Sequence, residues 1–326
     1  MKQHLVFGLM ILLLLILLPL VSLLPGSAAA PGEQQQPPAA MPQQLAPQAG
    51  ERTVSVLRSG TGEVEAIGMT EYIVGVVAAE MPARFHEQAL KAQAVAAYTF
   101  TRYRLEVGGA AHLSDSPDND QGYLCPQQRR ARWGCSFDQY EARITNAVRA
   151  VYGQTLMYGG RPIFAAYHAL SGGTTENAST YWGGHERSYL RGGAESPGDR
   201  LAPNFQVTTS FSADEMRAAL AQFDELELSG SPAAWFGEAT RSAAGTVTQI
   251  EVGGAVLTGR QLRQALALRS SNFEVAYDDK DSAFHVTTTG FGHGVGMSQT
   301  GADFMARQGS DYREILAHFY QGAEIV

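Results

Sequence analysis

Residues 71–82 read EYIVGVVAAEMP, and our expectations for the surrounding structure start from this stretch. The residues that lead up to Glu80 are apolar or small, and Pro82 cannot continue a helix. The pattern predicts a helix from about Glu71 to Glu80, with Thr70 as its N-cap. A carboxyl group at the end of such a run loses water, which raises its pKa and suits a general acid. The alternative is a helix-end glutamate that points into solvent.

Helices and strands follow one another without strict alternation along the rest of the chain. We expect strands at 53–58, 63–67 and 284–289, and two hairpins with Gly-Gly turns at 155–158 with 162–167 and at 247–252 with 255–257. We expect further helices at 87–105, 140–151 and 311–319, and a long loop at 108–136. Two capping boxes, Ser212 with Glu215 and Thr258 with Gln261, predict two short helices. The sequence therefore predicts an α+β fold, a mixed body of two lobes around a cleft.

The N-terminus predicts export and a membrane anchor. Residues 5–24 carry no charge, and at ~1.5 Å per residue they reach across the ~30 Å hydrocarbon core of a bilayer. A cleaved signal peptide is the alternative, because Ala28–Ala30 offers small residues for cleavage. We expect a membrane anchor at 1–25, a Pro/Gln-rich linker at 26–50 and the folded domain at 51–326.

Composition and motifs exclude several classes of function. Lys and Arg total 24 against 32 acidic residues, a net charge of -8, so we expect no nucleic-acid partner. The chain has no H-E-x-x-H and no P-loop, and the glycines at 290–296 lack the spacing of a dinucleotide fingerprint. A serine hydrolase that uses Ser171 and His168 stays open as an alternative. The sequence has no complete G-x-S-x-G motif, however: residues 296–300 read GMSQT, and Ser171 lacks the preceding glycine.

Three stretches carry a resemblance to a known family. They are 71–82 with 89–97, then 167–177 (YHALSGGTTEN), then 292–302 (GHGVGMSQTGA). Together they resemble the stage II sporulation protein D family. The resemblance implies a lytic transglycosylase that cuts peptidoglycan during engulfment in sporulation, with Glu80 as the catalytic acid and no cofactor. The family also includes amidase enhancers, so a glycan-binding protein that stimulates an amidase without cutting is the alternative.

The resemblance also implies partners and a location. The substrate would be glycan strands that a partner amidase has stripped of stem peptides, and other partners would be engulfment membrane proteins. The protein would sit in the cell membrane as a single-pass protein, held by its N-terminal helix. Its catalytic domain would then lie outside the cytoplasm, in the septal or intermembrane space of the sporulating cell.

The proposed chemistry explains why one carboxylate suffices. Glycosidases that use water need two carboxyl groups. A lytic transglycosylase instead uses the 6-hydroxyl of N-acetylmuramic acid as its nucleophile, so the second step is intramolecular and yields a 1,6-anhydro end. One glutamate can protonate the leaving oxygen and then accept the hydroxyl proton. Glu176 is the next carboxylate to consider.

The cleft around Glu80 is expected to use polar residues from the matching motifs. The substrate-binding residues we expect are Lys91, Gln93, Tyr167, His168, Ser171, Glu176, Asn177, His293 and Gln299. His168 is as well explained by a structural role. Tyr98 stands where many relatives carry arginine, and it either stacks on a sugar ring or belongs to the core.

The sequence departs from the family in one loop. Some relatives bind zinc there through two cysteines and a histidine, whereas residues 114–121 read SDSPDNDQ and contain no cysteine. We therefore expect no metal site. The exported setting favours a disulfide between Cys125 and Cys135, and a metal site formed by these cysteines with His112 is the alternative.

Overall fold

Two hydrophobic cores organise the part of the chain that the computed structural model describes, residues 51–326. The first core lies around α2 (Met69–Glu80) and α3 (Glu87–Arg102). The second core gathers around Trp235, Phe273 and Phe284. Helices and several small sheets mix along the chain, which confirms the predicted α+β class. The predicted anchor and linker lie outside the described residues, and within 51–326 no helix has the length and apolarity needed to cross a bilayer.

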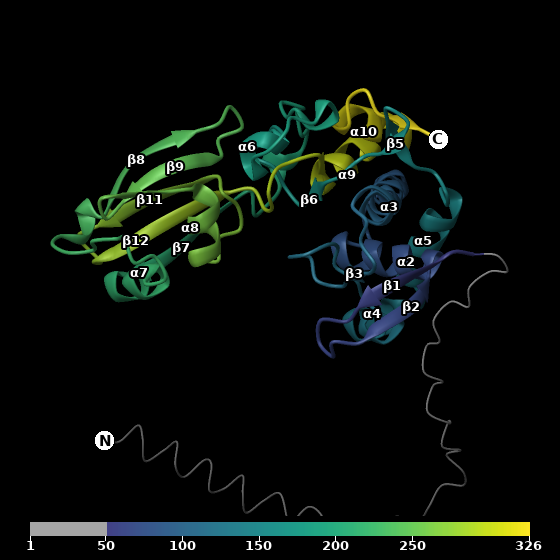
Figure 1. The fold of residues 1–326 in the computed structure, drawn as a ribbon, viewed down its shortest axis with the longest axis horizontal. Helices are drawn as coiled ribbons and strands as arrows, with labels where there is room; N and C mark the ends of the chain where they lie inside the picture. Colours follow the sequence, from purple (N-terminus) through teal and green to yellow (C-terminus); the bar gives the residue numbers. More distant parts are fainter. Residues whose placement is uncertain (1–50) are drawn as a thin grey trace, which may run out of the picture. The chain divides into compact units, whose positions relative to one another are not determined.

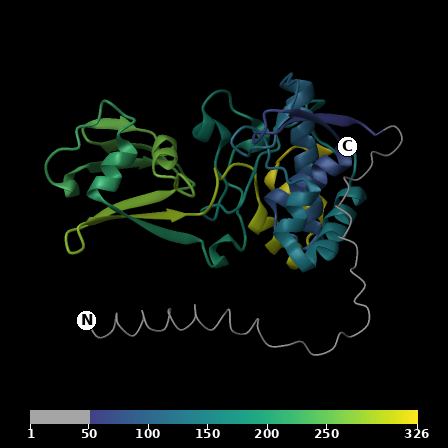
Figure 2. The ribbon, with the colours of Figure 1, turned by 90° about the horizontal axis from the view of Figure 1, so that it is seen from below.

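The first core is mainly helical. Its other helices are α4 (Pro126–Trp133), α5 (Phe137–Ala150), α6 (Ala178–Trp182), α9 (Gln299–Arg307) and α10 (Tyr312–Phe319). α3 contacts α2, α5, α9 and α10 (Figure 1). Figure 2 shows the blue α2 and α3 beside the teal α5. The buried alanines of α3, which are 89, 92, 94, 96 and 97, let its neighbours approach closely.

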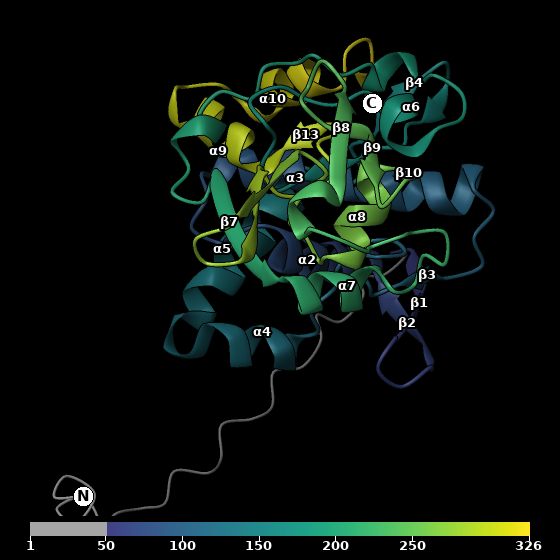
Figure 3. The same cartoon turned by 90° about the vertical axis from the view of Figure 1, so that its left-hand side faces the viewer.

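The second core is built on two antiparallel sheets. One has the order β11-β12-β7, with bounds Phe273–Asp278, Ala283–Thr289 and Gln206–Ser212. The other has the order β10-β9-β8, with bounds Ala255–Leu257, Val247–Val252 and Phe236–Arg241. Every second residue of β12 is buried, beginning with Phe284, as expected for a strand with one face on a core. α7 (Ala213–Leu220) lies against β7, and α8 (Gly259–Ala265) lies against β9 (Figure 3).

We call the elements around the first core the first body and those around the second core the second body. Short strands complete the first body. β1 (Thr53–Leu57) pairs antiparallel with β2 (Val64–Gly68) and parallel with β3 (Leu113–Ser114). β4 (Leu156–Tyr158) lies between β5 (Arg161–Pro162) and β14 (Glu324–Ile325). β6 (Tyr167–His168) pairs in parallel with β13 (Met297–Ser298). 3-10 turns occupy Gly134–Ser136, Ser188–Leu190, Asp199–Leu201 and Pro232–Ala234.

The pairing of β6 with β13 depends on Gly296. Its φ is +71°, which glycine adopts without strain, and a Cβ there would lie 2.0 Å from the carbonyl oxygen of Ala166. A larger residue would therefore separate the two strands. This pairing brings the second and third matching stretches of the sequence together.

Several local predictions are confirmed, and others are wrong. Both capping boxes form, and helices follow Ser212 and Thr258. α2 begins at Met69, so Thr70 lies inside the helix and is not its cap. The predicted helix 87–105 ends at Arg102 as an α-helix and continues as a π-helix, Tyr103–Val107. The long loop expected at 108–136 is wrong in its second half, which forms α4 and a 3-10 turn.

The missed helix α4 is held by a buried cation. The side chain of Arg129 is fully buried, and its guanidinium lies 2.9 Å from Glu71 Oε1 and 2.7 Å from Glu141 Oε1. It also donates a hydrogen bond to the carbonyl oxygen of Leu124. A buried arginine needs such partners, and these connect α4 to α2 and α5.

The predicted disulfide between Cys125 and Cys135 is absent, because both cysteines are free. α4 separates them, and eight helical residues span about 12 Å. A disulfide needs Cα atoms within about 7 Å of each other. Among the described residues, these thiols and His112 form no metal-ligating group either.

Gly75 provides a test of how the loop after β3 packs on α2. A Cβ at Gly75 would lie 2.2 Å from the ring of Tyr123 and 2.7 Å from the carbonyl oxygen of Leu124. We expect Gly75→Ala to lower the free energy of unfolding by about 1–3 kcal/mol, because the loop must move away from the helix. Gly60→Ala is the control, since its Cβ would meet nothing within 4 Å. Denaturant unfolding measures both variants, and equal stability of the two would contradict this packing.

Candidate active site

Glu80 is the last residue of α2, and its carboxylate is held by the loop that follows β3. Its Oε1 accepts a hydrogen bond of 2.7 Å from the backbone N–H of Gly122. Burial raises the pKa of Glu80 above the usual range for glutamate, and the Gly122 N–H offsets part of this effect. The carboxyl group therefore keeps its proton to a higher pH than an exposed glutamate does. That property suits a general acid.

The loop carrying Gly122 approaches α2 very closely. A Cβ at Gly122 would lie 3.1 Å from Glu80 Oε1 and 3.3 Å from the Cβ of Ala79, so only glycine fits without movement. Its neighbour Gln121 is buried and bonds on two sides. The Gln121 amide donates to the Thr101 hydroxyl at 3.2 Å and accepts from the Tyr167 hydroxyl at 2.9 Å. The loop is thus fixed between α3 and β6.

Three of the predicted substrate-binding residues gather beside this loop. Burial raises the pKa of Tyr167 well above its usual value, and the nearby charge of Glu80 raises it further. Gln299 donates to Gln93 Oε1 at 3.3 Å, while Nε2 of Gln93 is buried without a hydrogen-bond partner among the described residues. Gln93 is fully buried, and its side chain lies close enough to Tyr167 to affect the pKa of that phenol. Tyr167, Gln93 and Gln299 therefore form a connected set of neutral polar groups, which approaches Glu80 at Tyr167.

His168 and His293 are both neutral and lie next to each other. His168 Nδ1 donates to the carbonyl oxygen of Val295 at 3.1 Å, and burial lowers the pKa of His168 to about 4. His293 Nδ1 accepts from the N–H of Val295 at 3.0 Å, and burial lowers its pKa well below 6.5. The His293 ring lies 5.8 Å from that of His168 and 4.8 Å from that of Trp182.

A small pocket lies beside His293. Ser171, Glu176 and His293 line it together with side chains from the second body, among them Thr246 and Asn272. Glu176 accepts hydrogen bonds from the N–H of Asn177 and from the hydroxyl of Ser242. Six of the predicted residues therefore fall into two groups: Gln93, Tyr167 and Gln299 form one, and Ser171, Glu176 and His293 line this pocket.

Ser171 has no contact that would make it a nucleophile. Its hydroxyl donates to Asp199 Oδ2 at 2.8 Å, and Asp199 also accepts from the hydroxyl of Ser298. Within residues 51–326, Nε2 of His168 is buried and has no hydrogen-bond partner. The geometry therefore argues against the serine hydrolase alternative.

The remaining predicted residues have local roles. Lys91 pairs with Glu87 one turn earlier on α3, at 2.5 Å. Asn177 caps α6 by accepting from the N–H of Ser179 at 2.8 Å. Tyr98 packs against the first core and lies 5.8 Å from the ring of Tyr152. Sequence reasoning missed Gln121 and Gly122, because they lie in a stretch that was expected to be loop.

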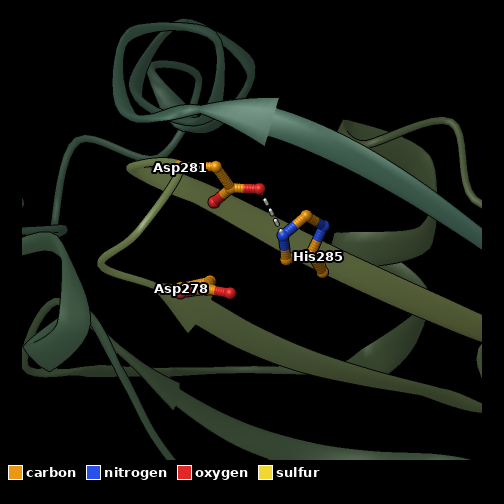
Figure 4. A group of neighbouring side chains, drawn as sticks. All are labelled: Asp278, Asp281 and His285. Atoms are coloured by element: carbon orange, nitrogen blue, oxygen red, sulfur yellow. Dashed lines mark hydrogen bonds and ion pairs between the residues drawn. The ribbon is translucent and has the colours of Figure 1, made fainter.

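One group on the second body has the makeup of a metal site. Asp278 ends β11, Asp281 lies in the turn, and His285 is on β12 (Figure 4). Their ligand atoms lie within 4.8 Å of one another. His285 bonds Asp281 at 3.0 Å, and each aspartate accepts a backbone N–H of the turn, from Lys280 and Ala283. These bonds explain the three side chains as parts of the β11–β12 turn.

Comparisons with known proteins agree with the motifs. A family model described as "Stage II sporulation protein" matches residues 58–158. The stage II sporulation protein D of Bacillus amyloliquefaciens is 39% identical over 280 residues, which cover 84% of this chain and 78% of that protein. The chain belongs to the stage II sporulation protein D family. The Bacillus subtilis (strain 168) protein of that name is 38% identical over 285 residues, covering 85% of this chain and 80% of that protein. An amidase enhancer of the same strain is 25% identical over 302 residues, covering 77% of this chain and 40% of the enhancer.

The contacts of Ser171 lead to a prediction about labelling and stability. We expect the protein to resist a fluorophosphonate probe, because the Ser171 hydroxyl is buried and bonded to Asp199. We expect Ser171→Ala to lower the free energy of unfolding by about 1–3 kcal/mol, since Asp199 loses a buried donor. Ser229→Ala, at an exposed position, should have no measurable effect. Labelling of the wild type that disappears in Ser171→Ala would overturn this assignment.

Proposed function

We propose that this protein is a membrane-anchored lytic transglycosylase that cleaves MurNAc–GlcNAc bonds of denuded peptidoglycan strands during engulfment in sporulation. Membership of the stage II sporulation protein D family supports a role in sporulation and in the cell wall. The enzymatic proposal rests on the environment of Glu80. Burial raises the pKa of its carboxyl group, and the N–H of Gly122 holds Oε1 in place.

In the proposed reaction, Glu80 acts twice. As an acid it gives its proton to the glycosidic oxygen, and the bond from C1 of MurNAc to that oxygen breaks. The 6-hydroxyl of the same sugar then attacks C1, and Glu80 takes the hydroxyl proton, which restores the acid. A C1–O6 bond replaces the broken bond, so no water is consumed. Holding the hydroxyl close to C1 supplies much of the acceleration.

The groups around Glu80 match a neutral substrate. Gln93, Tyr167 and Gln299 offer amide and hydroxyl groups without a net charge. Such groups can bond to sugar hydroxyls and acetamido groups. Stem peptides carry charged groups that these side chains would not pair, so denuded glycan is the better fit. The proposed mechanism uses no cofactor.

A second candidate function is a glycan-binding amidase enhancer. The enhancer relative matches most of this chain, which favours keeping this candidate. An enhancer has to bind glycan but does not need an acid, so it makes no use of the raised pKa of Glu80.

Replacing the acid separates the two candidates. We expect Glu80→Gln to reduce release of 1,6-anhydro ends about 10²–10⁴-fold, because glutamine cannot donate the proton. Amidase-treated sacculi are digested with each variant and the products are identified by mass spectrometry, with a sacculus pull-down to measure binding, which should persist. Wild-type activity should fall as the pH rises through the raised pKa of Glu80, since only the protonated carboxyl is active.

Glu176→Gln is the matched control, because it makes the same change at the other carboxylate. It should keep more activity than Glu80→Gln. If Glu80→Gln cuts at the wild-type rate, Glu80 is not the acid. Stimulation of an amidase by the wild type without anhydro ends would support the enhancer.

We also propose the cellular setting. Residues 5–24 would keep the protein in the cell membrane with its folded domain outside the cytoplasm, where it would meet engulfment membrane proteins and glycan stripped by a partner amidase.

We expect the mature protein to retain its N-terminal apolar segment. The reason is that an uncharged stretch of this length is longer than the h-region of most signal peptides. The intact mass of the protein purified from cell membranes measures this. A mature N-terminus at Pro31 would show cleavage instead.

A further inference from the structure

Asp120 anchors the loop that holds Glu80. It lies two residues before Gly122, and its side chain is only 4% exposed. Its Oδ1 lies 2.7 Å from Nε of Arg104, but the two atoms are not aligned for a hydrogen bond, so the attraction is coulombic. Its Oδ2 accepts a hydrogen bond of 2.8 Å from the N–H of Ser114. Asp120 therefore connects the loop both to β3 and to the helix end that carries Arg104.

Arg104 reaches Asp120 from an unusual turn. α3 continues as the π-helix Tyr103–Val107, in which the N–H of Gly108 donates to the carbonyl oxygen of Tyr103 at 2.8 Å. A π-turn contains more residues than an α-turn, so side chains beyond it point in a new direction. Turns of this kind occur often at functional sites.

The backbone between Asp120 and Gly122 is short and held on both sides. Only Gln121 separates the two residues, and its side chain bonds to Thr101 and Tyr167. A displacement of Asp120 should therefore also displace the N–H of Gly122. We propose that Asp120 and Arg104 form a positioning pair, which holds the N–H of Gly122 against the Glu80 carboxylate. The consequence for catalysis rests on the function proposed above.

The charged and titratable groups near Glu80 determine in which direction its pKa should shift when Asp120 is replaced. Tyr72 on α2 and Tyr167 on β6 are neutral, because burial raises the pKa of both phenols. The guanidinium of Arg132 on α4 donates to the carbonyl oxygens of Ala78 and Ala79. The N–H of Gly122 is the group that lowers the pKa of Glu80. Losing this bond raises that pKa, whereas removing the Asp120 charge by itself would lower it, so the sign distinguishes positioning from a direct charge effect.

The test compares Asp120→Asn with Asp118→Asn. Both make the same chemical change in one loop, but Asp118 is exposed. We measure the pH dependence of glycan cleavage and the ionisation of Glu80 by carboxyl ¹³C NMR, with Glu80→Gln to assign its signal. In Asp120→Asn, we expect the alkaline limb and the Glu80 titration to move to higher pH and the cleavage rate to fall about 10- to 100-fold. Asp118→Asn should behave as the wild type.

A second pair of variants covers the case in which Asp120→Asn does not fold. Arg104→Gln should move the Glu80 titration to higher pH, although losing the guanidinium charge would by itself have the same effect. For this variant the deciding measurement is the ¹H–¹⁵N amide signal of Gly122, which should shift when the bond from Gly122 to Glu80 is lost. Arg104→Lys, which keeps the charge, should restore most of the wild-type Glu80 titration, and an unchanged Gly122 signal in Arg104→Gln would contradict the positioning pair. A Glu80 titration that is unchanged or moves to lower pH in Asp120→Asn or Arg104→Gln would overturn the proposal. If the wild type makes no anhydro ends, the proposed function fails, but the NMR titration still tests the positioning pair.

Discussion

The parallel pairing of β6 with β13 is the constraint on which the candidate site depends. Gly296 allows the two strands to approach, and the register places Tyr167 beside Met297 and His168 beside Ser298. Tyr167 then reaches Gln121, whose neighbour in the chain donates to Glu80. A contact between segments far apart in the sequence therefore supports the surroundings of the carboxyl group. The second and third matching stretches of sequence meet because of it.

Local chemistry explains which parts of the fold could be predicted. A proline cannot continue a helix that precedes it, so α2 ends before Pro82. A capping box such as Ser212 with Glu215 needs only residues close in sequence. These features were predicted and are confirmed. α4 was missed because its sequence is polar and rich in arginine, and its stability comes from Arg129 reaching Glu71 and Glu141. The prediction of a disulfide between Cys125 and Cys135 was wrong for the same reason, because the unexpected helix α4 separates the two cysteines.

The site could be predicted in part for the same reason. The apolar run before Glu80 indicated a carboxyl group poor in water, and burial does raise its pKa. Sequence alone did not separate Gln93, Tyr167 and Gln299, which lie beside Glu80, from Ser171, Glu176 and His293, which line the pocket. That division depends on how distant segments pack. Gln121 and Gly122 gave no signal, because their function depends on a backbone N–H and on an amide held between two other elements.

The position of Glu80 at the last residue of α2 has an electrostatic consequence of its own. The aligned peptide dipoles of a helix place about half a negative charge at its C-terminal end. An ionised Glu80 must coexist with that field, which no change of a neighbouring side chain can remove. Arg132 offsets part of it by bonding to the carbonyl oxygens of Ala78 and Ala79. The backbone of the helix itself thus favours the protonated carboxyl group, and this contribution persists even when the surrounding side chains are replaced.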